Sequence, residues 1–163
     1  MDTKIKLRVQ GLTNSQIQSG AYALILAEEN GARRVPIIVG TSEAQSIAIA
    51  LEHITPPRPL THDLFMTFCS GFSAFSYGRF SFISSKTVFF YSELLFDDGI
   101  TQVRLDSRTS DAIAIALRVK CDIYTTEHIV SECGVVLEES SMPDEMDDND
   151  YALLDKEPED IED

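Results

Sequence analysis

The first fifty residues carry a clear pattern of apolar and polar positions. Residues 4–9 read KIKLRV, so apolar side chains alternate with basic ones, which predicts a strand with one buried face. Residues 21–40 form two β-rich runs around Asn30 and Gly31, which predicts a hairpin. Apolar residues then recur at i, i+3, i+4 and i+7 over residues 44–51, the spacing of one helix face.

The second half of the chain repeats this plan. A strand around Phe75–Ile83 can stand opposite the opening strand, a hairpin covers residues 87–106, and helical spacing covers residues 112–119. At an offset of 68 residues, Glu43 matches Asp111, and several apolar positions match as well. Chance could produce one such match but hardly the whole series.

We therefore predict an α+β fold, a pseudo-duplicated domain in which each half has three mostly antiparallel strands followed by one long and one short helix. Ser42 and Ser110 are the expected N-caps of the two long helices. The short helices are expected near residues 61–72 and 126–132, the first of them with Thr61 as its N-cap.

Acidic residues are concentrated in the last part of the chain. Residues 138–163 hold 13 of the 27 acidic residues but only one basic residue, Lys156. This segment has too few apolar groups to offset the entropy of ordering it. We predict a folded domain at residues 1–137 and an acidic flexible tail or linker at residues 138–163. The tail is either a solvated appendage or a contact for a protein partner.

Other features exclude several protein classes. Residues 1–10 lack the pattern of a signal or transit peptide, and no apolar run approaches the roughly 20 residues that a membrane span needs. The three cysteines form no C-x-x-C pair, which argues against a disulfide framework or a structural zinc site. The expectation is a cytoplasmic protein without a membrane partner.

All nine phenylalanines lie between Phe65 and Phe96. Strands buried on both faces in the core explain such a cluster, and so does an aromatic surface that closes a subunit interface. Both explanations stay open. The expected assembly is a homo-oligomer, with a dimer favoured.

Residues 56–65, PPRPLTHDLF, allow an architectural and a chemical interpretation. Three prolines stiffen the approach to a helix, which Thr61 would cap and Asp63 would stabilise through the helix dipole. That account leaves Arg58 and His62 unexplained. A histidine can act as a general base, a carboxylate can hold a divalent cation, and an arginine suits phosphate.

Glu43 and Asp111 allow the same two interpretations. Each falls in the first turn of its helix, where an acidic side chain offsets the helix dipole. Alternatively, both belong to one shared site, with Asp106 and Arg108 nearby. If the two halves are related by a rough two-fold axis, however, the helix starts need not be adjacent, and the two acids would serve different places.

We nevertheless expect the segment PPRPLTHDL to pack near the segment LDSRTSDA of residues 105–112. The proline segment has to cross from the first long helix to the second half, and Asp106 or Asp111 is a natural charge partner for Arg58. The expected separation of His62 or Arg58 from one of these acids is about 4 Å or one bridging water.

Three segments together resemble the bifunctional nuclease domain family, formerly a domain of unknown function. They are VPIIVGTSEAQSIAIALE, PPRPLTHDL and LDSRTSDAIAIALR, and the resemblance spans roughly residues 3–135. It implies an α+β domain made of two similar halves and, from plant relatives, nuclease activity on RNA and DNA. The family pattern falls on Gly40, Glu43, Arg58, Pro59, Thr61, His62, Asp63, Asp106, Arg108, Ser110 and Asp111.

The resemblance and these residue types lead to a first hypothesis, a nuclease acting on RNA and DNA by metal-assisted phosphodiester hydrolysis. His62 would activate water, and Asp63 and Glu43 would hold Mg²⁺ or Mn²⁺ as the expected cofactor. Arg58 and Arg108 would bind phosphate. The expected supporting residues are Thr61, Asp106, Ser110 and Asp111.

The second hypothesis is a non-catalytic regulatory or protein-interaction module of the bacterial cytoplasm. Nucleic-acid binding usually needs a basic face, yet residues 1–137 hold 14 acidic residues against 12 basic ones. A local basic face could still form if the first strand and the first hairpin are neighbours, although a solvated sheet surface would explain the same residues. They are Lys4, Lys6, Arg8, Arg33 and Arg34.

Overall fold

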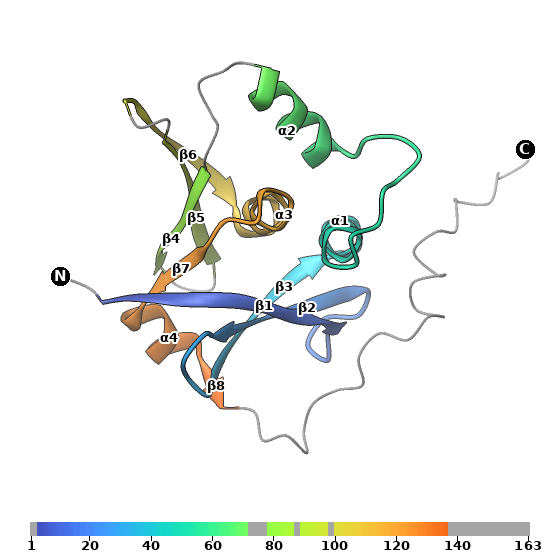
Figure 1. Ribbon diagram of the computed structural model, residues 1–163. Helices are drawn as coiled ribbons and strands as arrows, with labels where there is room; N and C mark the ends of the chain where they lie inside the picture. The colour runs from blue at the N-terminus through green and yellow to red at the C-terminus, as the bar shows by residue number, and fades with distance from the viewer. Residues whose placement is uncertain (1–2, 72–77, 87–88, 98–99, 137–163) are drawn as a thin grey trace, which may run out of the picture.

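The computed structural model describes residues 3–71, 78–86, 89–97 and 100–136 (Figure 1). The predicted acidic tail at 138–163 lies outside the described residues. So do the turn residues 98–99 of the second hairpin and residues 75–77 of the predicted strand.

Within the described residues, the first sheet has five strands in the order β7-β1-β2-β3-β8, and neighbouring strands are antiparallel. The strands are β1 (Lys4–Asn14), β2 (Ala21–Glu28), β3 (Arg33–Gly40), β7 (Ile123–Thr126) and β8 (Val135–Val136). The opening strand and the first hairpin are therefore confirmed. The two edge strands of this sheet, β7 and β8, are short and belong to the C-terminal half of the domain.

The second sheet has the order β4-β5-β6, and its strands are also antiparallel. They are β4 (Gly78–Lys86), β5 (Phe89–Asp97) and β6 (Gln102–Arg108). The predicted second hairpin is confirmed. The strand predicted around Phe75–Ile83 pairs with β5, and its outer side lies beside β7 of the first sheet (Figure 1).

Four helices are described at the predicted places: α1 (Thr41–Leu51), α2 (Thr61–Gly71), α3 (Thr109–Val119) and α4 (Glu127–Cys133). The predicted caps Ser42 and Ser110 are wrong. The N-cap positions of α1 and α3 are Gly40 and Arg108, because β3 and β6 run into these helices without a connecting loop.

The predicted cap Thr61 is wrong as well, since it is the first helical residue of α2. The backbone N–H of Leu60, just before the helix, is bound by the carboxylate of Asp63 at 2.8 Å. An acidic side chain three residues into the helix thus satisfies a donor that the helix itself leaves free.

The hydrophobic core lies where α1 and α3 pack side by side between the two sheets (Figure 1). Leu24 on β2, Ile47 on α1 and Ile113 on α3 are each 0% exposed. The chain is an α+β domain, and both halves run through three strands into a helix of 11 residues. The duplication itself stays a prediction.

Candidate functional site

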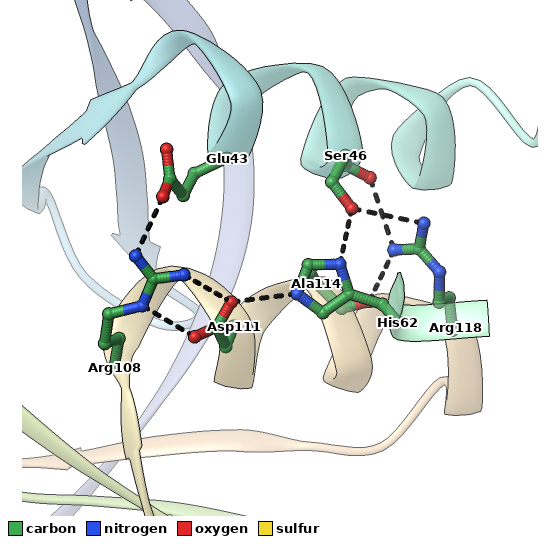
Figure 2. Close-up of polar contacts among 7 residues, drawn as sticks. All are labelled: Glu43, Ser46, His62, Arg108, Asp111, Ala114 and Arg118. Carbon is green, nitrogen blue, oxygen red and sulfur yellow. Dashed lines mark hydrogen bonds and ion pairs between the residues drawn. The ribbon is translucent and has the colours of Figure 1, made fainter. Parts of the chain in front are cut away.

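A pocket of about 310 Å³ opens where the first turns of α1, α2 and α3 meet. Four of its lining residues carry charge or titratable groups: Glu43 from α1, His62 from α2, Arg108 at the end of β6, and Asp111 from α3 (Figure 2). Leu60 and Thr61 also line it.

Arg108 joins the two acids that the sequence placed at equivalent positions. Its Nη1 lies 2.9 Å from Glu43 Oε1, and its Nε and Nη2 lie 2.8 and 3.1 Å from the two carboxylate oxygens of Asp111 (Figure 2). Of the two alternatives for these acids, one shared place or two different places, the structure has the shared place. α1 and α3 lie side by side with their first turns level, so both acids reach one guanidinium.

His62 is held at both ring nitrogens. Nε2 lies 2.9 Å from Asp111 Oδ1, and Nδ1 lies 2.7 Å from the hydroxyl of Ser46 on α1 (Figure 2). The side chain is only 15% exposed. The predicted approach of the proline segment to residues 105–112 is confirmed by the contact of His62 with Asp111.

The protonation of Asp111 follows from its neighbours. Burial alone would raise the pKa of this carboxyl, but hydrogen bonds from Arg108 and His62 outweigh burial and hold the pKa below its usual range. Asp111 is therefore ionised at neutral pH and only accepts hydrogen bonds. Because of this, Nε2 of His62 must carry the hydrogen that joins the two side chains.

Asp63 does not share the pocket, although it follows His62 in the chain. One carboxylate oxygen lies 2.6 Å from Nε of Arg118, and the other accepts the N–H of Leu60. Burial opposes ionisation of Asp63, yet these partners lower its pKa below the usual value. Asp63 joins α2 to α3 rather than facing a substrate.

The proposed cation pair of Asp63 and Glu43 does not fit this arrangement. Both oxygens of Asp63 are occupied by Arg118 and Leu60. Glu43 instead binds Arg108, which lies on the opposite side of His62 from Arg118 (Figure 2). Within the described residues, no group of three or more His, Cys, Asp or Glu side chains is arranged to hold a metal ion.

Arg58 is not the charge partner of Asp106 or Asp111, contrary to the prediction. The guanidinium is exposed, and nothing in the described part of the chain pairs with it. Asp111 is instead occupied by Arg108 and His62. Asp106 is exposed on β6, opposite Glu93 of β5, and neither Asp106 nor Ser110 lines the pocket.

Gly40 explains how Glu43 reaches its place. A Cβ atom at Gly40 would lie 2.6 Å from the carboxylate oxygen Oε2 of Glu43. The glycine before α1 thus leaves room for this side chain to fold back over the first turn. Thr61, which was predicted as a supporting residue, lies on the pocket rim, where its side chain is exposed.

Two residues of this network were missed by sequence reasoning, Ser46 and Arg118. Arg118 donates to the backbone oxygens of Ser46 and Ala114 at 3.2 and 2.9 Å, and to the hydroxyl of Ser46 at 3.3 Å (Figure 2). A signal was present, because Ser46 follows Glu43 by three residues and Arg118 follows Asp111 by seven, so each shares a helix face with a recognised acid.

Two of the five basic residues around the first strand are paired with acidic side chains. Lys6 lies 3.1 and 2.9 Å from carboxylate oxygens of Glu29 and Asp122. Arg33 lies 2.6 Å from Glu28 and 2.6 Å from Glu127. Acidic neighbours thus neutralise two of the five basic residues proposed for nucleic-acid contact.

The lowered pKa values of Asp63 and Asp111 predict a loss of stability in acid. A carboxyl whose folded pKa lies below its unfolded value, about 3.9 for Asp, contributes stability above that value and loses it as pH falls further. We expect the free energy of unfolding, measured with urea, to fall between about pH 5 and pH 2. The double variant Asp63→Asn/Asp111→Asn should show a shallower fall, and equal slopes would contradict this account.

Comparison with known proteins gives the family. The sequence matches the family described as "Bifunctional nuclease domain" over residues 24–138, which include every lining residue of the pocket. It is 36% identical over 143 residues to proteins from two strains of Mycobacterium tuberculosis, and the match covers 88% of this chain and 81% of each relative. Both relatives are described as uncharacterized. The chain belongs to the bifunctional nuclease domain family, as its motifs led us to expect.

Proposed function

We propose that this protein is a nuclease that hydrolyses phosphodiester bonds of RNA and DNA in the pocket between α1, α2 and α3. The observation that carries the proposal is the pairing of His62 with ionised Asp111 beside the exposed guanidinium of Arg108. A proton acceptor and a phosphate-binding group thus face one open pocket. The family of the chain supports the same reaction class.

Six of the pocket residues have a role in this proposal. Arg108 binds the phosphate, and Asp111 orients His62 and stabilises its protonated form. Water attacks the phosphorus atom as the bond to the leaving oxygen breaks. The Ser46 hydroxyl gives its hydrogen to Nδ1 of His62 and takes one from the attacking water, and the leaving oxygen is then protonated from His62 or solvent. Thr61 on the rim positions the chain of the substrate.

Glu43 holds Arg108 over the pocket when no phosphate is bound. The guanidinium is 66% exposed, and an incoming phosphate can take over the hydrogen bond that Nη1 makes to Glu43. Mg²⁺ or Mn²⁺ stays a proposed cofactor from the family resemblance. No step above runs through a cation, because Asp63 and Glu43 are not placed to bind the same cation.

The test is a cleavage assay on single-stranded RNA and DNA of the same sequence. Each substrate is incubated with purified protein in Mg²⁺, in Mn²⁺ and in excess chelator. We expect multiple turnovers on both substrates, and the chelator arm measures how much of the rate depends on a cation. Absence of turnover in every arm would contradict the nuclease and favour the second hypothesis, a non-catalytic interaction module.

We also infer that the chain self-associates in the cytoplasm. Leu64 and Phe68 on α2 are 63% and 64% exposed, an apolar surface typical of subunit contacts. No helix in the described ranges is long and apolar enough to span a membrane. Light scattering would measure the subunit number, for which we favour a dimer. The acidic tail remains a proposed contact for a protein partner.

A further inference from the structure

Arg118 is the most enclosed charged group near the pocket. Its side chain is 11% exposed, and four hydrogen bonds join it to three helices. On α2 it binds Asp63, on α1 it binds the backbone oxygen and hydroxyl of Ser46, and within α3 it binds the oxygen of Ala114 (Figure 2). Arg118 itself does not line the pocket.

With a neutral His62 ring, the hydrogen atoms of this network have one consistent arrangement. Arg118 can only donate, so the Ser46 hydroxyl oxygen accepts from it. Among the described residues, Nδ1 of His62 is then the acceptor within reach of the Ser46 hydroxyl hydrogen, at 2.7 Å. At the other end of the ring, ionised Asp111 only accepts, so Nε2 donates. Every group has a partner, and Nδ1 is left as the unprotonated nitrogen.

We propose that Arg118 is a positioning residue of this site, which acts on His62 through Ser46 and Asp63. Through Asp63 it holds the first turn of α2, which carries His62, against α3. Through Ser46 it orients the hydroxyl that donates to Nδ1, so the ring is fixed between α1 and Asp111. The proposal rests on the proposed nuclease reaction for its kinetic consequence, but its structural consequence can be measured without substrate.

The direct readout is the ring N–H of His62 in NMR spectra of the full chain labelled with ¹⁵N-histidine. In the wild type, a fixed ring should give an observable Nε2–H resonance that exchanges slowly with water, assigned by its absence in His62→Gln. Arg118→Met and Ser46→Ala should each lose this resonance through exchange. Arg33→Met is the matched control, because it removes an arginine with two carboxylate partners far from the pocket, and it should keep the resonance.

Two variants keep the test decisive if Arg118→Met fails to fold. Asp63→Asn/Arg118→Met removes the carboxylate that Arg118→Met would leave without its partner, and Ser46→Ala keeps the contact of Arg118 with Asp63 while placing a good helix former in α1. If either Ser46→Ala or a folded Arg118 variant keeps a slowly exchanging Nε2–H, the proposal is overturned.

Kinetics on the same proteins separate positioning from substrate binding. Misplacing His62 should lower kcat by about 100-fold with little change in KM. Arg118→Lys should restore part of the loss, because a lysine can reach Asp63 but lacks the planar set of donors that also binds α1. A rise in KM of about 100-fold with kcat unchanged would also overturn the proposal. If the wild type shows no turnover, the proposed nuclease fails while the NMR result still decides the role of Arg118.

Discussion

Replacing His62 with alanine should lower nuclease turnover by about 100- to 10,000-fold, the usual contribution of a positioned proton acceptor. The ring is the only group in the described pocket that joins Asp111 to the Ser46 hydroxyl, so its loss breaks the proton path at both ends. The measurement is the initial rate of cleavage of single-stranded RNA and DNA under saturating substrate.

The matched control is His128→Ala. This histidine is 54% exposed on α4, and it lies 3.5 Å from Glu132, outside the pocket lining. Purified side by side, the control should keep the wild-type rate. Full activity in His62→Ala would mean that a contaminating nuclease or another site does the cleavage, and the assignment of the pocket would be wrong.

The sequence predicted the local elements of the fold well, because their signals lie within a few residues of one another. The alternation at residues 4–9, the Asn30–Gly31 turn and the helical spacing at 44–51 correspond to β1, the first hairpin and α1. The N-caps of α1 and α3 were misplaced by two residues, since spacing cannot show that a strand runs directly into a helix.

Contacts within the site were harder to predict, because they depend on how distant helices pack. Asp63 and Arg118 are 55 residues apart, so nothing near PPRPLTHDL showed that Asp63 already had a partner. The meeting of Glu43 and Asp111 at Arg108 likewise follows from the side-by-side packing of α1 and α3. The approach of the proline segment to residues 105–112 was predicted correctly, because this segment has to cross from the first long helix to the second half, although the partner of Asp111 is His62 and not Arg58.

In the proposed nuclease, the charges of the pocket would let it bind a phosphate despite its acidic residues. Glu43 and Asp111 bring two negative charges, and Arg108 brings one positive charge that both acids share. An approaching phosphate therefore meets a guanidinium whose exposed face is already oriented. In this proposal, a phosphate binds when Arg108 exchanges a carboxylate for it, so we expect substrate affinity to depend on this arginine.

Replacing Arg108 with methionine should accordingly lower kcat/KM by about 10- to 150-fold, the range expected when a hydrogen bond to a charged group worth about 1.5–3 kcal/mol is lost. Stability should change by no more than about 1 kcal/mol, because the side chain is largely exposed and exposed ion pairs contribute little. Cleavage rates over a range of substrate concentrations, with urea denaturation of the same samples, measure both effects.

Two further variants show whether the loss comes from phosphate binding. Arg108→Lys keeps the positive charge without the planar fork, so it should recover only part of the wild-type kcat/KM. Glu43→Gln keeps Arg108 on Asp111 but removes the carboxylate that competes with phosphate, so KM should fall or stay unchanged. A rise in KM for Glu43→Gln, together with wild-type kinetics for Arg108→Met, would mean that Glu43 and not Arg108 contacts the substrate, and would reverse their roles in the proposed site.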